Sequence, residues 1–136
     1  MQLRAIKQVD TVPALGFSTS ENHAMQRAIV GLFDRWNLSD NQAATLLGDI
    51  SPRTFQRWKD GQYGRVGIDL AARMSNLLGI HKALRLLFAD KERGYGWVGR
   101  ASDDFAGRSA LDVMLGGQIT DLMRVRRYLD SQRGPW

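Results

Sequence analysis

Apolar residues recur along the chain with the spacing of amphipathic helices. From Met25 to Trp36 they fall at i, i+3, i+4, i+7, i+8 and i+11, which predicts a helix over about 23–36. Ser18 and Glu21 stand before it at the spacing of a capping box. Further helices, most of them opened by a serine or closed by a glycine, are predicted between Ser39 and Gly48, between Ser51 and Gly61, and over about 67–78, 80–89, 110–115 and 118–131.

No stretch alternates with period two for long enough to predict a strand, so we expect an all-α helical bundle. Gly79 is interpreted as the stop between the helices over 67–78 and 80–89. Residues 90–106 lack helical periodicity and contain three glycines, which indicates a linker. The predicted organisation is an N-terminal arm over 1–17, a bundle over 18–89, the linker over 90–106 and a C-terminal helical region over 107–136.

The second and third predicted helices have the pattern of a helix-turn-helix. Ala44 is small where the two helices would cross, Gly48 falls at the turn, and Ser51-Pro52 begins the next helix. When Phe55 and Trp58 are buried, the outer face of the second of these helices is basic and polar, as a DNA-reading helix requires. The predicted DNA-binding residues are Ser51, Arg53, Thr54, Gln56, Arg57 and Lys59. The alternative is a helix with a solvated basic face.

Composition favours an anionic partner and gives little support to an enzyme. The 19 Lys and Arg exceed the 14 Asp and Glu, a net charge of +5. Cysteine is absent, which excludes disulfides and thiolate chemistry. His23 and His81 are far apart without metal-ligand spacing, so we expect no catalytic residue, no metal and no cofactor. Without a signal peptide or membrane span in the sequence, we expect a cytoplasmic protein.

The last thirty residues, Gly107 to Trp136, combine a capped short helix, a Gly-Gly break and a longer helix with arginines on its outer side. Trp, Tyr and Arg are the residue types that anchor protein interfaces. This tail therefore indicates a surface held by another protein, and the alternatives are a solvated helix face and a disordered end.

The chain resembles the Xre/MbcA/ParS-like antitoxins, specifically those paired with RES-domain toxins. The residues that carry the resemblance are Phe105-Ala106-Gly107-Arg108-Ser109-Ala110-Leu111-Asp112-Val113-Met114, Arg126-Arg127-Tyr128-Leu129, Leu77-Leu78-Gly79-Ile80, Ala83-Leu84, Leu87-Phe88 and Trp97-Val98. The resemblance implies an Xre-like DNA-binding and dimerising half over 18–89 that represses its own operon. It also implies a toxin-binding region over 107–136, a homodimer, and a RES toxin that consumes NAD⁺.

For the toxin-binding surface we expect Arg126, Arg127, Tyr128, Arg133 and Trp136. A cleft built for a dinucleotide pyrophosphate attracts cations, so the tail is suited to occupy the mouth of such a site. The alternative function is a stand-alone helix-turn-helix transcription regulator whose C-terminal region only dimerises.

Overall fold

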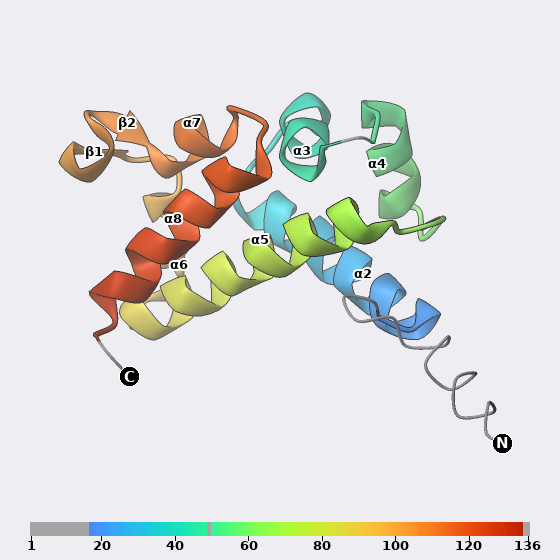
Figure 1. Ribbon diagram of the computed structural model, residues 1–136, viewed down its shortest axis with the longest axis horizontal. Helices are drawn as coiled ribbons and strands as arrows, with labels where there is room; N and C mark the ends of the chain where they lie inside the picture. The colour runs from blue at the N-terminus through green and yellow to red at the C-terminus, as the bar shows by residue number, and fades with distance from the viewer. Residues whose placement is uncertain (1–16, 49, 135–136) are drawn as a thin grey trace, which may run out of the picture.

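The computed structural model describes residues 17–48 and 50–134, which form a helical body with one small two-stranded sheet (Figure 1). The first helices are α2 (Thr19–Arg35), α3 (Asp40–Leu47), α4 (Pro52–Lys59), α5 (Ile68–Leu87) and α6 (Lys91–Trp97). They are followed by β1 (Ala101–Ser102), the 3-10 helix η1 (Asp103–Phe105), β2 (Arg108–Ser109), α7 (Ala110–Met114) and α8 (Ile119–Gln132). Strands β1 and β2 pair antiparallel. The all-α prediction is confirmed, and the expected arm lies outside the described residues except for Phe17.

Serine caps begin helices where the sequence predicts them. Each serine Oγ accepts a hydrogen bond from the backbone N–H three residues later, which satisfies a donor that the first helical turn leaves unpaired. The oxygen–nitrogen distances are 3.0 to 3.1 Å. The caps are Ser18 of α2, Ser39 of α3, Ser51 of α4 and Ser109 of α7.

Gly79 does not end a helix, and the prediction of two helices over 67–78 and 80–89 was wrong. Helix α5 runs without a break from Ile68 to Leu87. Its buried stripe continues across the glycine, because Leu77 and Ile80 are both fully buried. Gly79 instead provides room for a neighbouring helix: a Cβ at this position would lie 2.5 Å from Cζ of Arg126 in α8.

The expectation that residues 90–106 contain no helix was also wrong. Asp90 caps α6 by accepting from the Glu92 N–H at 2.9 Å. Gly94 is buried, and a Cβ there would lie 3.5 Å from Cβ of Phe88 and 3.6 Å from the Leu84 carbonyl oxygen. These are ordinary van der Waals distances, and they show that α6 packs on the end of α5. A seven-residue helix is too short to show an amphipathic period, which explains why the pattern did not predict it.

One continuous core joins both ends of the chain. Helix α5 packs against α2 on one side and against α8 on the other, and lies across the centre of the molecule (Figure 1). Buried residues of the core come from α2, α3, α4, α5, α7 and α8, including Phe33, Trp58, Leu77, Met114 and Leu122. Within the described ranges no helix combines the length and the apolar character needed to cross a membrane.

Candidate functional site

Helix α4 presents a polar and basic face because its apolar residues point inward. Phe55 and Trp58 are buried, with ring centroids 6.0 Å apart. The Ser51 hydroxyl caps the helix and lies 3.0 Å from the Thr54 hydroxyl, so both of these predicted DNA-binding residues also stabilise the first turn. The remaining predicted residues, Arg53, Gln56, Arg57 and Lys59, are exposed. The structure thus places all six on one short helix and its cap, and their contacts with DNA stay a prediction.

Asp40, the first residue of α3, contacts two of these six residues. Its carboxylate accepts from Nε2 of Gln56 at 3.0 Å and lies 2.6 Å from Nζ of Lys59. These contacts, first with Lys59 and then with Gln56, lower the pKa of Asp40 below its ordinary value. Asp40 therefore fixes the orientation of Gln56 and partly neutralises Lys59. The sequence did not predict this role of Asp40, because Gln56 and Lys59 are 16 and 19 residues further along the chain and come close to it only after folding.

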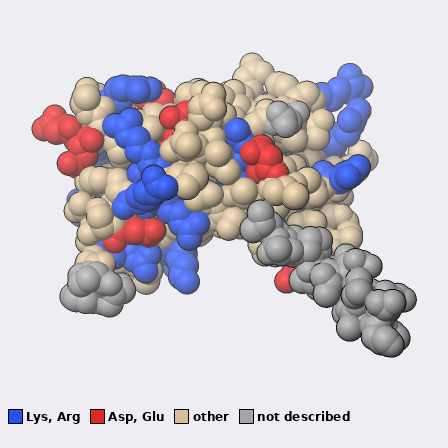
Figure 2. Space-filling view, viewed as in Figure 1, with Lys and Arg blue, Asp and Glu red and all other residues tan. Residues whose placement is uncertain are grey.

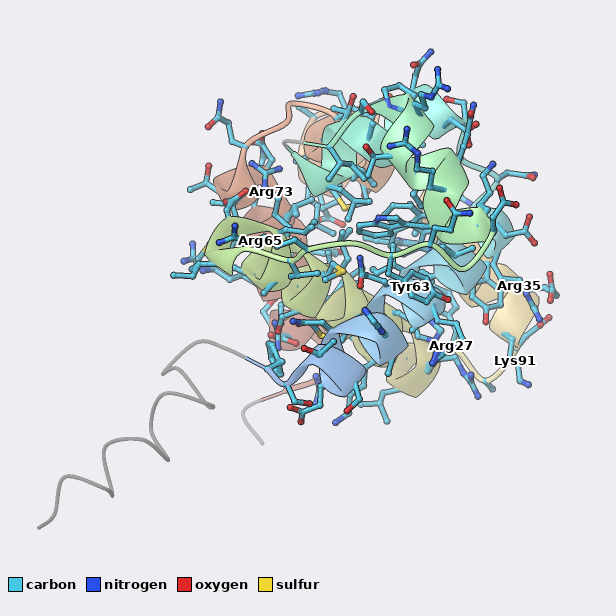
Figure 3. The ribbon with its side chains drawn as sticks, turned by 90° about the vertical axis from the view of Figure 1, so that its right-hand side faces the viewer. Arg27, Arg35, Tyr63, Arg65, Arg73 and Lys91 are labelled. Atoms are coloured by element: carbon cyan, nitrogen blue, oxygen red, sulfur yellow. The ribbon has the colours of Figure 1, made fainter. Side chains whose placement is uncertain are left out.

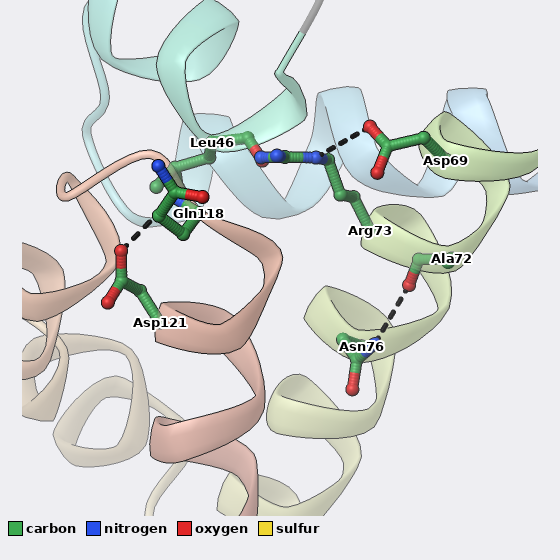
Figure 4. A network of polar contacts seen from close by, with 7 residues as sticks. All are labelled: Leu46, Asp69, Ala72, Arg73, Asn76, Gln118 and Asp121. Carbon is green, nitrogen blue, oxygen red and sulfur yellow. Dashed lines mark hydrogen bonds and ion pairs between the residues drawn. The ribbon is translucent and has the colours of Figure 1, made fainter.

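Arg73 of α5 fixes the turn between α3 and α4. Its Nη1 donates to the Leu46 carbonyl at 3.4 Å, and its Nε donates to the Asp69 carboxylate at 2.9 Å (Figure 4). Gly48 ends α3 with a φ of +89°, and a Cβ there would lie 2.7 Å from Nε of Arg73. The turn needs glycine for its backbone and for this close approach. The C-terminal end of α3 is thereby tied to α5.

Further basic side chains share a face with α4. Arg27 of α2 lies with Cζ 6.0 Å from the ring centroid of Tyr63, and Arg65 follows in the connection to α5 (Figure 3). Gln26 donates to the Tyr63 carbonyl oxygen at 2.8 Å, which ties this connection to α2. The basic surface around α4 therefore extends beyond the residues that the sequence singled out.

The second candidate surface lies on α8. Its inner stripe, Leu122, Val125 and Leu129, is buried in the core. Arg124 and Arg127 are exposed, and Lys and Arg side chains gather over α8 and the adjoining half of α5 (Figure 2). Trp136 lies outside the described residues.

Tyr128 is held by contacts within the chain. Its ring stacks on Trp97 at an interplanar angle of 2° and a centroid distance of 6.2 Å, and meets the Phe105 ring edge-on at 5.2 Å. Its hydroxyl donates to the Asp104 carboxylate at 2.5 Å. This bond, with the desolvation of the phenol, raises the pKa of Tyr128. Tyr128 thus anchors the 97–105 segment on α8, and a contact with a toxin stays a prediction.

Arg126 and Arg133 lie around a hollow between α5 and α8. The Arg126 side chain lies over Gly79, and its Nη1 donates to Oδ1 of Asn76 at 3.4 Å. Asp130 lies 3.1 Å from Nη1 of Arg133 and 3.9 Å from Nε of Arg126. The α5–α8 hollow has a volume of about 390 Å³ and is lined by Gly79, Lys82, Arg126, Asp130, Arg133 and Gly134. Sequence reasoning placed Arg126 and Arg133 on a partner surface but missed Lys82, which comes from another helix.

The two histidines lie against separate tyrosines. His23 packs on Tyr63, with ring centroids 5.3 Å apart, and His81 stacks on Tyr95 at 5.9 Å. Burial, and then the positive charge of Arg85, lower the pKa of His81. Within residues 17–48 and 50–134 no group of three His, Cys, Asp or Glu side chains is placed to hold a metal ion.

Two family models together cover most of the chain. Residues 18–79 match the model of the antitoxin Xre-like helix-turn-helix domain. Residues 83–135 match that of the antitoxin Xre/MbcA/ParS C-terminal toxin-binding domain. The chain is also 44% identical over 128 residues to Uncharacterized protein y4oB of Sinorhizobium fredii, which covers 91% of this chain and 98% of the relative. The first match ends and the second begins inside α5, with residues 80–82 between them, so one continuous helix carries residues of both domains.

Proposed function

Because this chain belongs to the Xre/MbcA/ParS-like antitoxins, we propose that it neutralises a RES-domain toxin and represses its own operon. The coarser function follows from the family: the chain is an antitoxin with a helix-turn-helix domain and a toxin-binding domain. The match of 83–135 to a toxin-binding domain favours this function over a regulator whose C-terminal region only dimerises. The observation that carries the proposal is the pairing of a basic α4 face with a separate basic α8 face on one continuous core.

We assign operator recognition to α4. Arg53 and Arg57 are exposed and form no ion pair with a described residue, so both guanidinium groups are available to base edges or phosphates. Gln56 is presented in a fixed orientation by Asp40. In a homodimer, two α4 helices would read half-sites about 34 Å apart on one face of the duplex.

We assign toxin binding to α8, with Arg127 on its exposed side and Arg126 and Arg133 at the hollow that α8 forms with α5. Trp136 follows these cations in the sequence. The RES type is supported by the likeness of Phe105–Met114 and Arg126–Leu129 to antitoxins of RES systems. A RES toxin acts on NAD⁺, whose pyrophosphate is anionic, and its cleft therefore suits a cationic inhibitor. The chain itself needs no cofactor for this role.

A double variant tests whether the two functions use separate surfaces. Arg53→Ala combined with Arg57→Ala removes both available cations of α4 and leaves its buried residues in place. We expect operator binding in a gel-shift assay to be lost while the RES-domain toxin still co-purifies at the wild-type ratio. Simultaneous loss of both activities, in a variant that retains its circular dichroism spectrum, would contradict the assignment.

A further inference from the structure

We propose that the α5–α8 hollow binds a carboxylate side chain of the toxin, with Lys82, Arg126 and Arg133 as its cationic walls. This inference rests on the proposed function. The inference adds Lys82 to the toxin-binding surface, and this residue lies outside the matched toxin-binding domain, which begins at residue 83. It also specifies the partner's chemistry at this point as an aspartate or glutamate.

The hollow is built by a glycine in the middle of a helix. Glycine at such a position destabilises the helix by about 1 kcal/mol relative to alanine. Here the missing side chain leaves room for Arg126, whose Cζ and Nε would lie 2.5 and 2.7 Å from a Cβ at position 79. Asn76, one turn earlier on α5, holds the other side of the guanidinium. Arg126 is therefore seated against α5 with 39% of its side chain still exposed.

The charges around the hollow favour an anion. Lys82, Arg126 and Arg133 face one carboxylate, that of Asp130, which already accepts from Arg133 at 3.1 Å. Lys82 is exposed and forms no ion pair with any residue in the described ranges. An incoming carboxylate would meet two or three cationic groups, which is the usual arrangement for a charge-assisted contact across an interface.

The position and lining of the hollow indicate a protein partner. Its lining comes from α5 and from the C-terminal part of α8, and that end of α8 lies across the molecule from α4 (Figure 1), so a duplex bound along α4 would not cover the hollow. Among the residues that the structure describes, none that line it carries an aromatic ring or a hydroxyl to hold a base or a ribose. Next to it, Arg133 lines a second hollow with Leu86, whose side chain is 60% exposed. An acidic side chain beside an apolar one on the toxin surface fits this pair of hollows.

The test compares charge reversals at two lysines, one that lines the hollow and one at the start of α6. Lys82→Glu places a carboxylate in the hollow, whereas Lys91→Glu makes the same change on α6, away from α8 (Figure 3). The measurement is the Kd for the purified RES-domain toxin by calorimetry at two salt concentrations. We expect Lys82→Glu to weaken binding about tenfold or more, with a shallower salt dependence, and Lys91→Glu to change it less than about twofold.

The outcomes separate this inference from the proposed function. If the wild-type chain fails to bind the RES-domain toxin, the proposed function is wrong. If the wild type binds and folded Lys82→Glu and Lys82→Ala bind equally well, the hollow is not a toxin site. A loss of operator binding in Lys82→Glu with unchanged toxin binding would assign the hollow to DNA and likewise overturn the inference.

Discussion

Gly79→Ala should separate stability from toxin binding. The substitution adds a methyl group inside α5, where alanine stabilises a helix by about 1 kcal/mol relative to glycine. The added Cβ would lie 2.5 Å from Cζ of Arg126, so the guanidinium must move. The group that moves is the end of a flexible side chain. Its lost contacts are a 3.4 Å hydrogen bond to Asn76 and a 3.9 Å approach to Asp130.

The stability change follows from these two effects. Contacts of a partly exposed arginine contribute about 0–1 kcal/mol, which at most cancels the gain in helix propensity. We therefore expect the free energy of unfolding to stay constant or to rise by up to about 1 kcal/mol, equivalent to a Tm increase of up to about 4 °C. Toxin affinity should fall about five- to tenfold, since Arg126 no longer lies in the α5–α8 hollow.

Thermal unfolding and calorimetric titration with the toxin measure the two effects on the same sample. Gly48→Ala is the matched control. There the backbone has a φ of +89° and the neighbouring Arg73 is buried, so we expect a loss of about 1–3 kcal/mol in stability. A Gly79→Ala variant that loses more than about 1 kcal/mol in stability, or that binds the toxin as tightly as wild type, would contradict this role of Gly79.

Three further predictions concern the DNA surface and the pH dependence of stability. Asp40→Asn should free Lys59 to contact a phosphate. In anisotropy titrations on a duplex of random sequence, the slope of the logarithm of the binding constant against the logarithm of the salt concentration should then be steeper by about one. An unchanged slope would contradict this role. Arg65→Ala should make that slope shallower by about one without altering the ratio of operator to random affinity; a changed ratio would instead indicate base reading. Burial and Arg85 lower the folded-state pKa of His81, so the unfolded chain binds its proton more readily. The free energy of unfolding should therefore fall as the pH decreases from 7 through 6.5 toward 5, and less in His81→Phe; equal profiles in urea titrations would rule this out.

Local signals in the sequence predicted most of the fold. Ser39 and Ser51 stand where a side-chain oxygen must cap a helix, and both do so. The stripe from Met25 to Trp36 predicted α2, because a long amphipathic helix repeats its pattern several times. These features depend on neighbours within about one helical turn.

The errors arose where a residue serves a distant contact. Gly79 has the local pattern of a helix stop, but it is retained inside α5 because Arg126 lies over it. No local pattern distinguishes a glycine that ends a helix from one that makes room for a side chain 47 residues later.

The candidate surfaces were predictable only in part. The exposed face of α4 follows from its period, since burying Phe55 and Trp58 leaves Arg53 and Arg57 outside. The hydrogen bond from Gln56 to Asp40 could not be predicted in this way, because it joins residues of two different helices. Tyr128 was predicted as a partner contact from its residue type, whereas the structure also gives it a place in the packing around Phe105.

The most direct test of the account is NAD⁺ consumption by the purified RES-domain toxin with and without this chain. At a saturating concentration of the chain, we predict that NAD⁺ remains at its starting level, and that Arg53→Ala with Arg57→Ala protects it equally well. Continued loss of NAD⁺ at the rate of the toxin alone would contradict the central claim that this antitoxin neutralises a RES toxin through a surface separate from its DNA-reading helix.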